Sequence, residues 1–163
     1  GDSTHSFRLL GARDIALPGS TSLNVGAAVR ARSGGPTNVL GAHQLYGLDE
    51  VFILPRGSGE RLPWNGSVDL HLGYAIRMTG TQTVTMTFDV FNVFNFQAPV
   101  AVDQRYTTQQ VRPVINGTTK DLNNLQRAGG EAFQPETDRN PSFGKPTAYQ
   151  APMTMRFGLR GSF

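Results

Sequence analysis

The stretch Ser67–Met78, SVDLHLGYAIRM, alternates apolar residues with small or polar residues without a break. Period-two alternation is typical of a β-strand with one apolar face and one polar face, because successive side chains of a strand point to opposite sides. About eleven residues at ~3.3 Å each, tilted by ~45°, rise roughly 26 Å, which suits a strand that crosses a lipid bilayer. Strands of soluble domains are typically about half as long.

Four other stretches repeat the alternation of Ser67–Met78. Residues 83–96, 151–163 and 21–32 have it clearly, with aromatic residues gathering at Phe91, Phe94 and Phe96. Residues 6–17 form a weaker candidate, since Arg13 falls among the apolar positions, and a β-bulge could reset the phase there. We therefore expect an all-β protein: an antiparallel meander of about five long transmembrane strands near 6–17, 21–32, 67–79, 83–96 and 151–163.

The connections between these strands differ in length. LPGST and TGTQT are tight turns, whereas residues 33–66 and 97–150 are long and rich in Gly, Pro and polar residues. Outer-membrane barrels have short periplasmic turns and longer extracellular loops. The alternation of short and long connections therefore predicts extracellular loops at 33–66 and 97–150 and a periplasmic C-terminus. A short helix is expected near Asp121–Ala128, with Leu122 and Leu125 on one side and Gly129 as its stop.

Composition excludes several classes of function. The chain of 163 residues has no Cys, so thiolate nucleophiles and Cys-based zinc sites are excluded. Its net charge of +3 is carried by scattered basic residues, which argues against nucleic-acid binding. No run of 18 apolar residues is present, and the N-terminus lacks the pattern of a signal peptide. His5, His43 and His71 have no accompanying nucleophile motif, so we expect no enzyme and no cofactor.

Several motifs carry a resemblance to a known family. The chain ends in Phe163 behind an alternating strand, as outer-membrane barrels do, and DVFNVFN at 89–95 resembles the NxFN signature of late strands in TonB-dependent receptors. The segments that look like the C-terminal region of Oar-like TonB-dependent receptors are VRARSGGPTNVLGAH, EVFILPRGSGERLPW, AVDQRYT and NPSFGKPTAYQAP. The resemblance extends from about Phe7 to Phe163.

The resemblance implies a role in transport across the bacterial outer membrane. Such receptors are barrels of about 22 strands with a plug in the lumen, and they import scarce ligands such as siderophores, cobalamin or oligomeric nutrients. The implied partners are the remaining strands and plug, the TonB–ExbB–ExbD energy system, the barrel-insertion machinery, and lipid with lipopolysaccharide. About five strands cannot close a barrel, and an open edge in lipid leaves unpaired N–H and C=O groups. We therefore expect this chain to be a piece that pairs with further strands.

A soluble β-sandwich, as in a binding or adhesin module, is the alternative. Such a fold would bury its apolar faces against each other. It would have no need of strands this long, and it would not sort its connections by length, so the membrane interpretation is preferred.

Candidate site residues fall into two groups. We expect a lumen-facing set on the polar side of the strands: Arg30, Arg32, Asp69, His71, Arg77, Asp89, Arg156 and Arg160. Arginines there would attract anionic ligands, or would pair with acidic plug residues, which we prefer because the guanidinium fork suits buried carboxylates. Asp69 and His71 are too few to hold a metal ion. The second group is a ligand-contacting set in the loops: Arg105, Tyr106 and Arg112. Trp64 and Phe96 are expected in an interfacial aromatic girdle.

Deletion of Phe163 should impair barrel assembly, because the resemblance implies that the insertion machinery reads the C-terminal residue. The measurement is the amount of receptor inserted in isolated outer membranes. Unchanged insertion of the truncated chain would count against Phe163 as an end signal.

Overall fold

The computed structural model describes residues 4–43 and 45–163, apart from the side chain of Asp49. The chain divides into two compact units. The first, called the strand unit here, comprises residues 5–33, 64–98 and 150–163. The second, called the loop unit, contains residues 34–63 and 99–149 together with Thr4.

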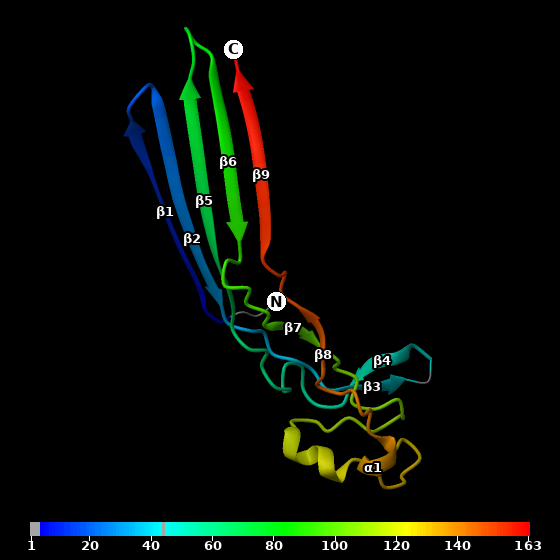
Figure 1. The fold of residues 1–163 in the computed structure, drawn as a ribbon. Coiled ribbons are helices and arrows are strands. Elements are labelled where there is room, and N and C mark those ends of the chain that lie inside the picture. Colours follow the sequence, from blue (N-terminus) through cyan, green and yellow to red (C-terminus); the bar gives the residue numbers. More distant parts are fainter. Residues whose placement is uncertain (1–3, 44) are drawn as a thin grey trace. The chain divides into compact units, whose positions relative to one another are not determined.

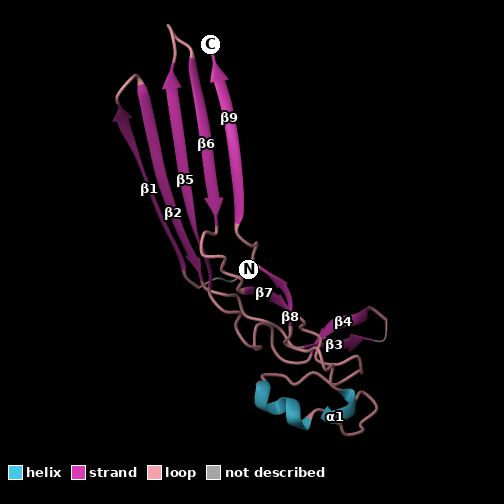
Figure 2. Ribbon diagram, viewed as in Figure 1, coloured by secondary structure: helices cyan, strands magenta, loops and turns pink. Residues whose placement is uncertain are grey.

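A five-stranded sheet forms the strand unit (Figures 1 and 2). It consists of β1 (Ser6–Leu17), β2 (Thr21–Arg32), β5 (Asn65–Arg77), β6 (Thr83–Phe91) and β9 (Thr154–Ser162). The strands lie in the order β1-β2-β5-β6-β9, and every neighbouring pair is antiparallel. The all-β class and the antiparallel meander of about five long strands are therefore confirmed.

Three of the expected strands have other bounds in the structure. The strand expected at 83–96 ends at Phe91, because Asn92 adopts a φ of 52°, a left-handed conformation that breaks extended backbone. The strand expected at 151–163 begins three residues later, at Thr154. The strand around Ser67–Met78 instead begins earlier, at Asn65, and ends at Arg77.

The pairing register keeps most apolar residues of the five strands on one face, whereas Leu10 and Phe91 lie on the other. Along one row across β2, β5, β6 and β9, Val25 is opposite Leu72, Leu72 is opposite Phe88, and Phe88 is opposite Phe157. β1 pairs with β2 over twelve consecutive positions without a register shift, so the bulge considered for this strand is absent. Arg13 accordingly lies opposite Val25, on the apolar face.

Side chains of the apolar face remain exposed to solvent. Phe157 and Leu159 are 70 % and 69 % exposed, and Phe88 in the middle of the sheet is 41 % exposed. A sandwich would bury this row against a second sheet. The exposure of these side chains therefore argues against the sandwich alternative.

The loop unit, in contrast, has a hydrophobic core of its own. Where the sequence predicts loops, the structure has two small antiparallel sheets, β3 (Leu40–His43) with β4 (Gly47–Phe52) and β7 (Pro99–Val102) with β8 (Pro146–Tyr149). The buried residues of this core are Val39, Ile53, Leu54, Tyr106, Val111, Leu122, Leu125 and Phe133. They come from both long connections, which are joined by backbone hydrogen bonds from Leu40 N to Gln104 O and from Tyr106 N to Leu40 O.

Two short helical segments complete the loop unit. The helix expected at Asp121–Ala128 is instead a 3₁₀ helix, η1 (Thr119–Asn124), with Asp121 accepting a hydrogen bond from the backbone N–H of Thr118. Leu122 and Leu125 are both buried, as their shared side predicts. The other segment is α1 (Pro135–Asp138).

An ion pair fixes α1 against the segment that follows η1. The Arg127 guanidinium contacts both carboxylate oxygens of Asp138 at 2.6–3.0 Å, in the bidentate geometry that suits these two groups. The hydrogen bonds from Arg127 and from the backbone N–H of Gln134 hold the pKa of Asp138 below its usual value. The same pairing raises the pKa of Arg127.

Among the described residues, no helix is long and apolar enough to cross a membrane.

Candidate functional site: the polar face of the sheet

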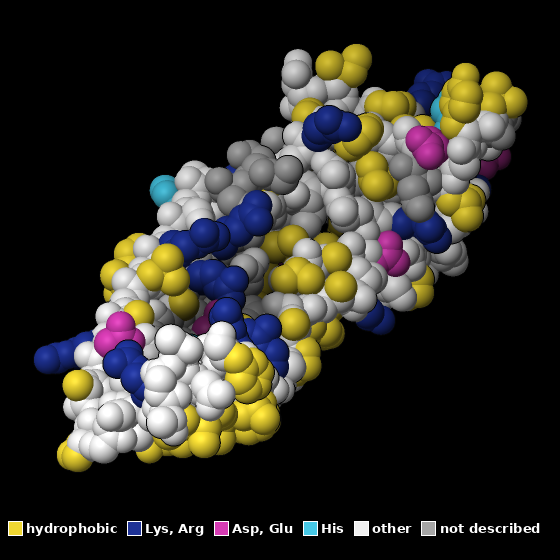
Figure 3. Space-filling view, turned by 90° about the horizontal axis from the view of Figure 1, so that it is seen from above, with side chains coloured by type: hydrophobic (Ala, Val, Ile, Leu, Met, Phe, Trp, Pro, Cys, Tyr) yellow, Lys and Arg dark blue, Asp and Glu magenta, His cyan; other side chains and the backbone are white. Residues whose placement is uncertain are grey.

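All eight residues predicted to face a lumen lie on the polar face of the five-stranded sheet. The register places them on the side opposite the apolar rows, and they are Arg30, Arg32, Asp69, His71, Arg77, Asp89, Arg156 and Arg160. Basic side chains gather in a row when the molecule is viewed from the turn end (Figure 3). That this face lines a lumen stays a prediction.

A three-residue network crosses β5, β6 and β9 on this face. His71 and Asp89 are directly opposite in the register, and His71 Nδ1 lies 2.5 Å from Asp89 Oδ1. Arg156, opposite Asp89 on the other side, donates to Asp89 Oδ2 from Nε and Nη2 at 3.1 and 2.9 Å. Asp89 is 6 % exposed, and a buried carboxylate is costly without partners. The two neighbours therefore compensate the burial of Asp89 and join three strands.

Asp69 is held by a separate set of partners. It accepts a hydrogen bond from Arg30 on β2 and, through Oδ1, a second one from the backbone N–H of Asn92 at 2.9 Å. Asp69 and His71 thus contact different partners and do not form a joint metal or proton site. No group of three or more metal-ligating side chains occurs in the described part of the chain. Both carboxylates are engaged by arginines, which suits a structural charge network better than acid–base chemistry.

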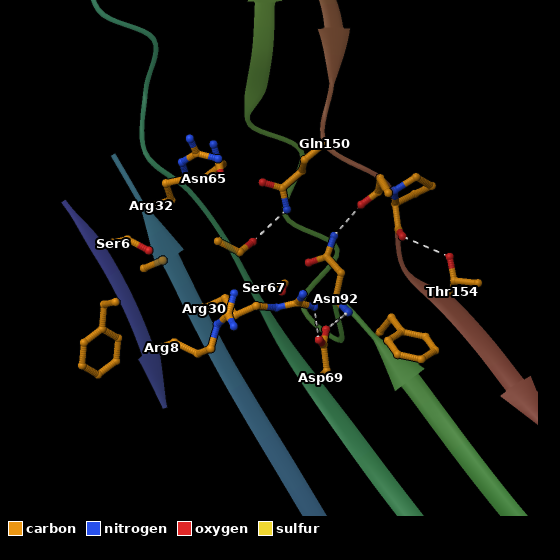
Figure 4. Close-up of a pocket in the computed structure, with 16 residues that line it drawn as sticks. Ser6, Arg8, Arg30, Arg32, Asn65, Ser67, Asp69, Asn92, Gln150 and Thr154 are labelled. Carbon is orange, nitrogen blue, oxygen red and sulfur yellow. Dashed lines mark hydrogen bonds and ion pairs between the residues drawn. The ribbon is translucent and has the colours of Figure 1, made fainter. Parts of the chain in front are cut away.

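A pocket of about 500 Å³ lies at the end of the sheet where the long connections begin (Figure 4). Its charged lining residues are Arg8, Arg30, Arg32 and Asp69. Asn65, Asn92 and Gln150 add amide groups. Phe91 closes one side with an aromatic ring, and Arg156 lies over that ring at 5.3 Å from its centroid. The pocket lining therefore combines guanidinium groups, a carboxylate and several amide side chains.

Asn92, the first residue of the NVFN segment at 92–95, lines this pocket. Asn92 and Asn95 both have a φ of 52°, a conformation that Asn tolerates better than most residues. The Asn92 amide donates to Phe96 O and Ala151 O, and its oxygen accepts from the Phe96 N–H, at 2.9–3.0 Å. Asn95 Oδ1 accepts from the Met153 N–H at 3.0 Å. The motif thus ends β6 and fastens the segment that leads into β9.

Three residues of this site were missed by the sequence analysis. The face on which Arg8 lies could not be predicted, because Arg13 makes the phase of residues 6–17 uncertain. The alternation over Ser6–Arg8 is the feature that indicates it. The sequence places Asn92 within the NVFN motif but indicates no role for its side chain. Gln150 belongs to a long connection, and nothing in its sequence context indicates that its amide donates to Gly66 O at 2.8 Å.

The three residues predicted to contact a ligand, Arg105, Tyr106 and Arg112, belong to the loop unit. Tyr106 is 4 % exposed, and its ring packs against Phe133 and Phe143 at centroid distances of 5.7 and 5.1 Å. Burial raises the pKa of Tyr106, while the positive charge of Arg139 acts in the opposite direction. Its ring therefore has a packing role. Arg105 is half-buried and Arg112 is exposed. Ligand contact by these three residues stays a prediction.

The two residues expected in an aromatic girdle lie close to the loop end of the sheet. Trp64 directly precedes β5 and is 56 % exposed, and Phe96 follows the turn after β6 and is 48 % exposed. Their contact with a membrane interface stays a prediction.

Comparison with known proteins confirms the predicted resemblance. The chain is 39 % identical over 173 aligned residues to the TonB-dependent transporter Oar of Myxococcus xanthus, and the match covers 99 % of this chain. The chain spans about 16 % of the length of that relative. No family model matches the chain, and no solved structure matches it.

Replacement of Asn92 by Gly should destabilise the strand unit. Gly accepts the left-handed conformation, so the substitution tests the three lost hydrogen bonds to Phe96 and Ala151, together worth about 3 kcal/mol at roughly 1 kcal/mol each. The measurement is urea unfolding in lipid vesicles. The matched control is Asn116→Gly, since Asn116 has a φ of 57° and no side-chain hydrogen bond recorded in the described structure. Equal stability of the two variants would contradict the role given to the Asn92 amide.

Proposed function

We propose that this chain supplies five transmembrane strands and two extracellular loops to an outer-membrane receptor. Nearly the whole of this chain resembles one part of a TonB-dependent transporter. The receptor imports a scarce ligand such as a siderophore, cobalamin or an oligomeric nutrient. The relative is named a transporter, which supports transport rather than catalysis. The single observation that carries the proposal is the exposed apolar face of a sheet whose other face is charged.

Lipid is the environment that this sheet fits. Its apolar face exposes Leu70, Leu72 and Phe88 at 41–44 %, and Phe157 and Leu159 at about 70 %. Soluble monomers rarely expose a contiguous apolar surface of this extent. In lipid the apolar side chains avoid the unfavourable free energy of contact with water, and the polar face turns toward a lumen.

Strand length supports the same environment. β1 and β2 each have 12 residues and β5 has 13. At ~3.3 Å per residue and a tilt of ~45°, twelve residues rise roughly 28 Å, enough to cross the apolar band of an outer membrane.

The orientation follows from where the connections lie within the strand unit. The tight turns after β1 and β5 lie at the same end of the sheet as the end of β9 (Figure 1). We place this end in the periplasm and the long connections outside the cell. The loop unit, with its own hydrophobic core, then forms part of the ligand entrance.

The proposed partners follow from the sheet edges and from the relative. Among the described strands, β1 and β9 each pair on one side only. Unpaired backbone groups in lipid cost several kcal/mol each, so further strands of the same receptor would pair with both edges. The plug, the TonB–ExbB–ExbD system, the insertion machinery, lipid and lipopolysaccharide complete the set of partners.

Cell fractionation tests the proposal. Receptor containing this chain should partition into the outer membrane and should be extracted from it only by detergent. Recovery of the chain as a folded, monodisperse protein from plain buffer would overturn the proposal.

Adjacent positions on the two faces allow a sharper test. Phe88→Lys should lower the free energy of unfolding by about 2–4 kcal/mol in lipid vesicles, because it places a charge against lipid in the middle of the sheet. The matched control is Thr87→Lys, one residue away on the polar face, where the opposite residues Gly73 and Gly158 leave space. Equal destabilisation by both substitutions would show that the two faces have the same environment.

A further inference from the structure

Arg13 is the one charged residue on the apolar face of the five described strands. The ladders place it in a row with Val25, Leu72, Phe88 and Phe157, none of which carries a charge. An arginine side chain that faces lipid is unfavourable to an extent that depends on its depth, with the largest cost at the middle of the bilayer. Arg13 therefore needs a compensating contact that the apolar face itself does not provide.

No group of opposite charge contacts Arg13 within the described part of the chain. Arg13 is exposed, and it makes no ion pair and no side-chain hydrogen bond with any described residue. Asp14 is adjacent in sequence, but it lies on the polar face, where its carboxylate accepts a hydrogen bond from Asn24 Nδ2. The residues of β1 that share the face of Arg13 are all uncharged: Phe7, Leu9, Gly11, Ile15 and Leu17. A counter-charge for Arg13 must therefore come from outside the described strands.

The position of Arg13 along β1 indicates where that counter-charge lies. β1 ends at Leu17, four residues beyond Arg13. Four residues at ~3.3 Å each, tilted by ~45°, rise roughly 9 Å, so Arg13 lies in the half of a ~25 Å apolar band that is nearer to the tight turns. The stem of an arginine can lie along apolar side chains while its guanidinium group extends toward the interface between lipid and water. For Arg13 those side chains are Ile15 and Leu17, which are 40 % and 37 % exposed.

Small residues form the apolar face on the side of Arg13 that is nearer to the loop end. Gly11, two residues before Arg13 on β1, is opposite Ala27 on β2. A Cβ atom placed on Gly11 would have no atom within 4 Å, and Ala27 is exposed. The surface there is therefore open and uncharged. A lipid whose headgroup contacts Arg13 from the turn end would lay its acyl chain over Gly11 and Ala27, toward the middle of the bilayer.

We propose that Arg13 binds the phosphate group of a negatively charged phospholipid in the periplasmic leaflet. A guanidinium group binds phosphate oxygens through paired hydrogen bonds. A headgroup phosphate already lies at the interface, whereas a carboxylate on a neighbouring strand would bring a second charge into the apolar band, where its desolvation is costly. This inference rests on the proposed function, since that function places the apolar face in lipid and the tight turns in the periplasm.

Arg13→Gln tests the lipid site with little risk to assembly, because it removes a charge from an apolar face. Arg13→Lys keeps the charge, and the matched control Arg8→Gln removes the same charge from the opposite face of β1. The wild type and each variant are purified as the assembled receptor in mild detergent and mixed with equal amounts of phosphatidylglycerol and phosphatidylcholine. Native mass spectrometry then measures the ratio of the two lipids that stay bound.

The wild type should retain phosphatidylglycerol in preference to phosphatidylcholine. Arg13→Gln should lower this preference about fivefold, because one basic residue near an anionic membrane surface contributes ~1 kcal/mol. Arg13→Lys should keep most of the preference, since its ammonium group still attracts the phosphate. Arg8→Gln should leave the preference at the wild-type value.

The inference is overturned if Arg13→Gln keeps the lipid preference of the wild type, which would assign the counter-charge of Arg13 to protein. It is also overturned if Arg8→Gln loses as much of the preference as Arg13→Gln, because the effect would then follow net charge alone. Each receptor is also checked for its place in the outer membrane. Normal insertion with either result refutes the lipid site alone, whereas absence of the wild type from the outer membrane refutes the proposed function.

Discussion

The antiparallel register is the constraint on which the strand unit depends. Because side chains alternate between faces, a shift of one residue in any pair would move a whole strand's apolar side chains to the polar face. The four ladders keep Val25, Leu72, Phe88 and Phe157 in one row, and they keep His71, Asp89 and Arg156 in the row beside it. One geometric relation thus produces both a surface suited to lipid and a surface that carries the charges.

The charged residues of the polar face also help to fix this register. Asp89 is nearly buried and contacts β5 through His71 and β9 through Arg156. A shift between these strands would leave a buried carboxylate without its partners, which is among the costlier changes in a protein interior. At the loop end Asp69 accepts hydrogen bonds from Arg30 on β2 and from the backbone N–H of Asn92. Two separate sets of paired charges therefore lie along one face.

The hydrophobic core of the chain lies in its long connections. Val39 and Ile53 come from the first, and Tyr106, Leu122 and Phe133 come from the second. The strand unit is a single sheet without a packed interior, because neither of its faces packs against a second sheet within the unit. The loop unit has only its own side chains to exclude water. Hence the residues that look least regular in sequence are the ones that form a packed interior.

The sequence by itself determined the long strands, their two faces and their order, because period-two alternation is a local property that every strand carries within about twelve residues. It also placed all eight polar-face residues on one side. It could not determine the pocket or the core of the loop unit. Arg8 faces Arg30, Asn92 fastens Ala151, and Tyr106 packs on Phe133 only after segments distant along the chain have paired. Contacts of that kind depend on register and on three-dimensional packing, and neither leaves a periodic signal in the residues themselves.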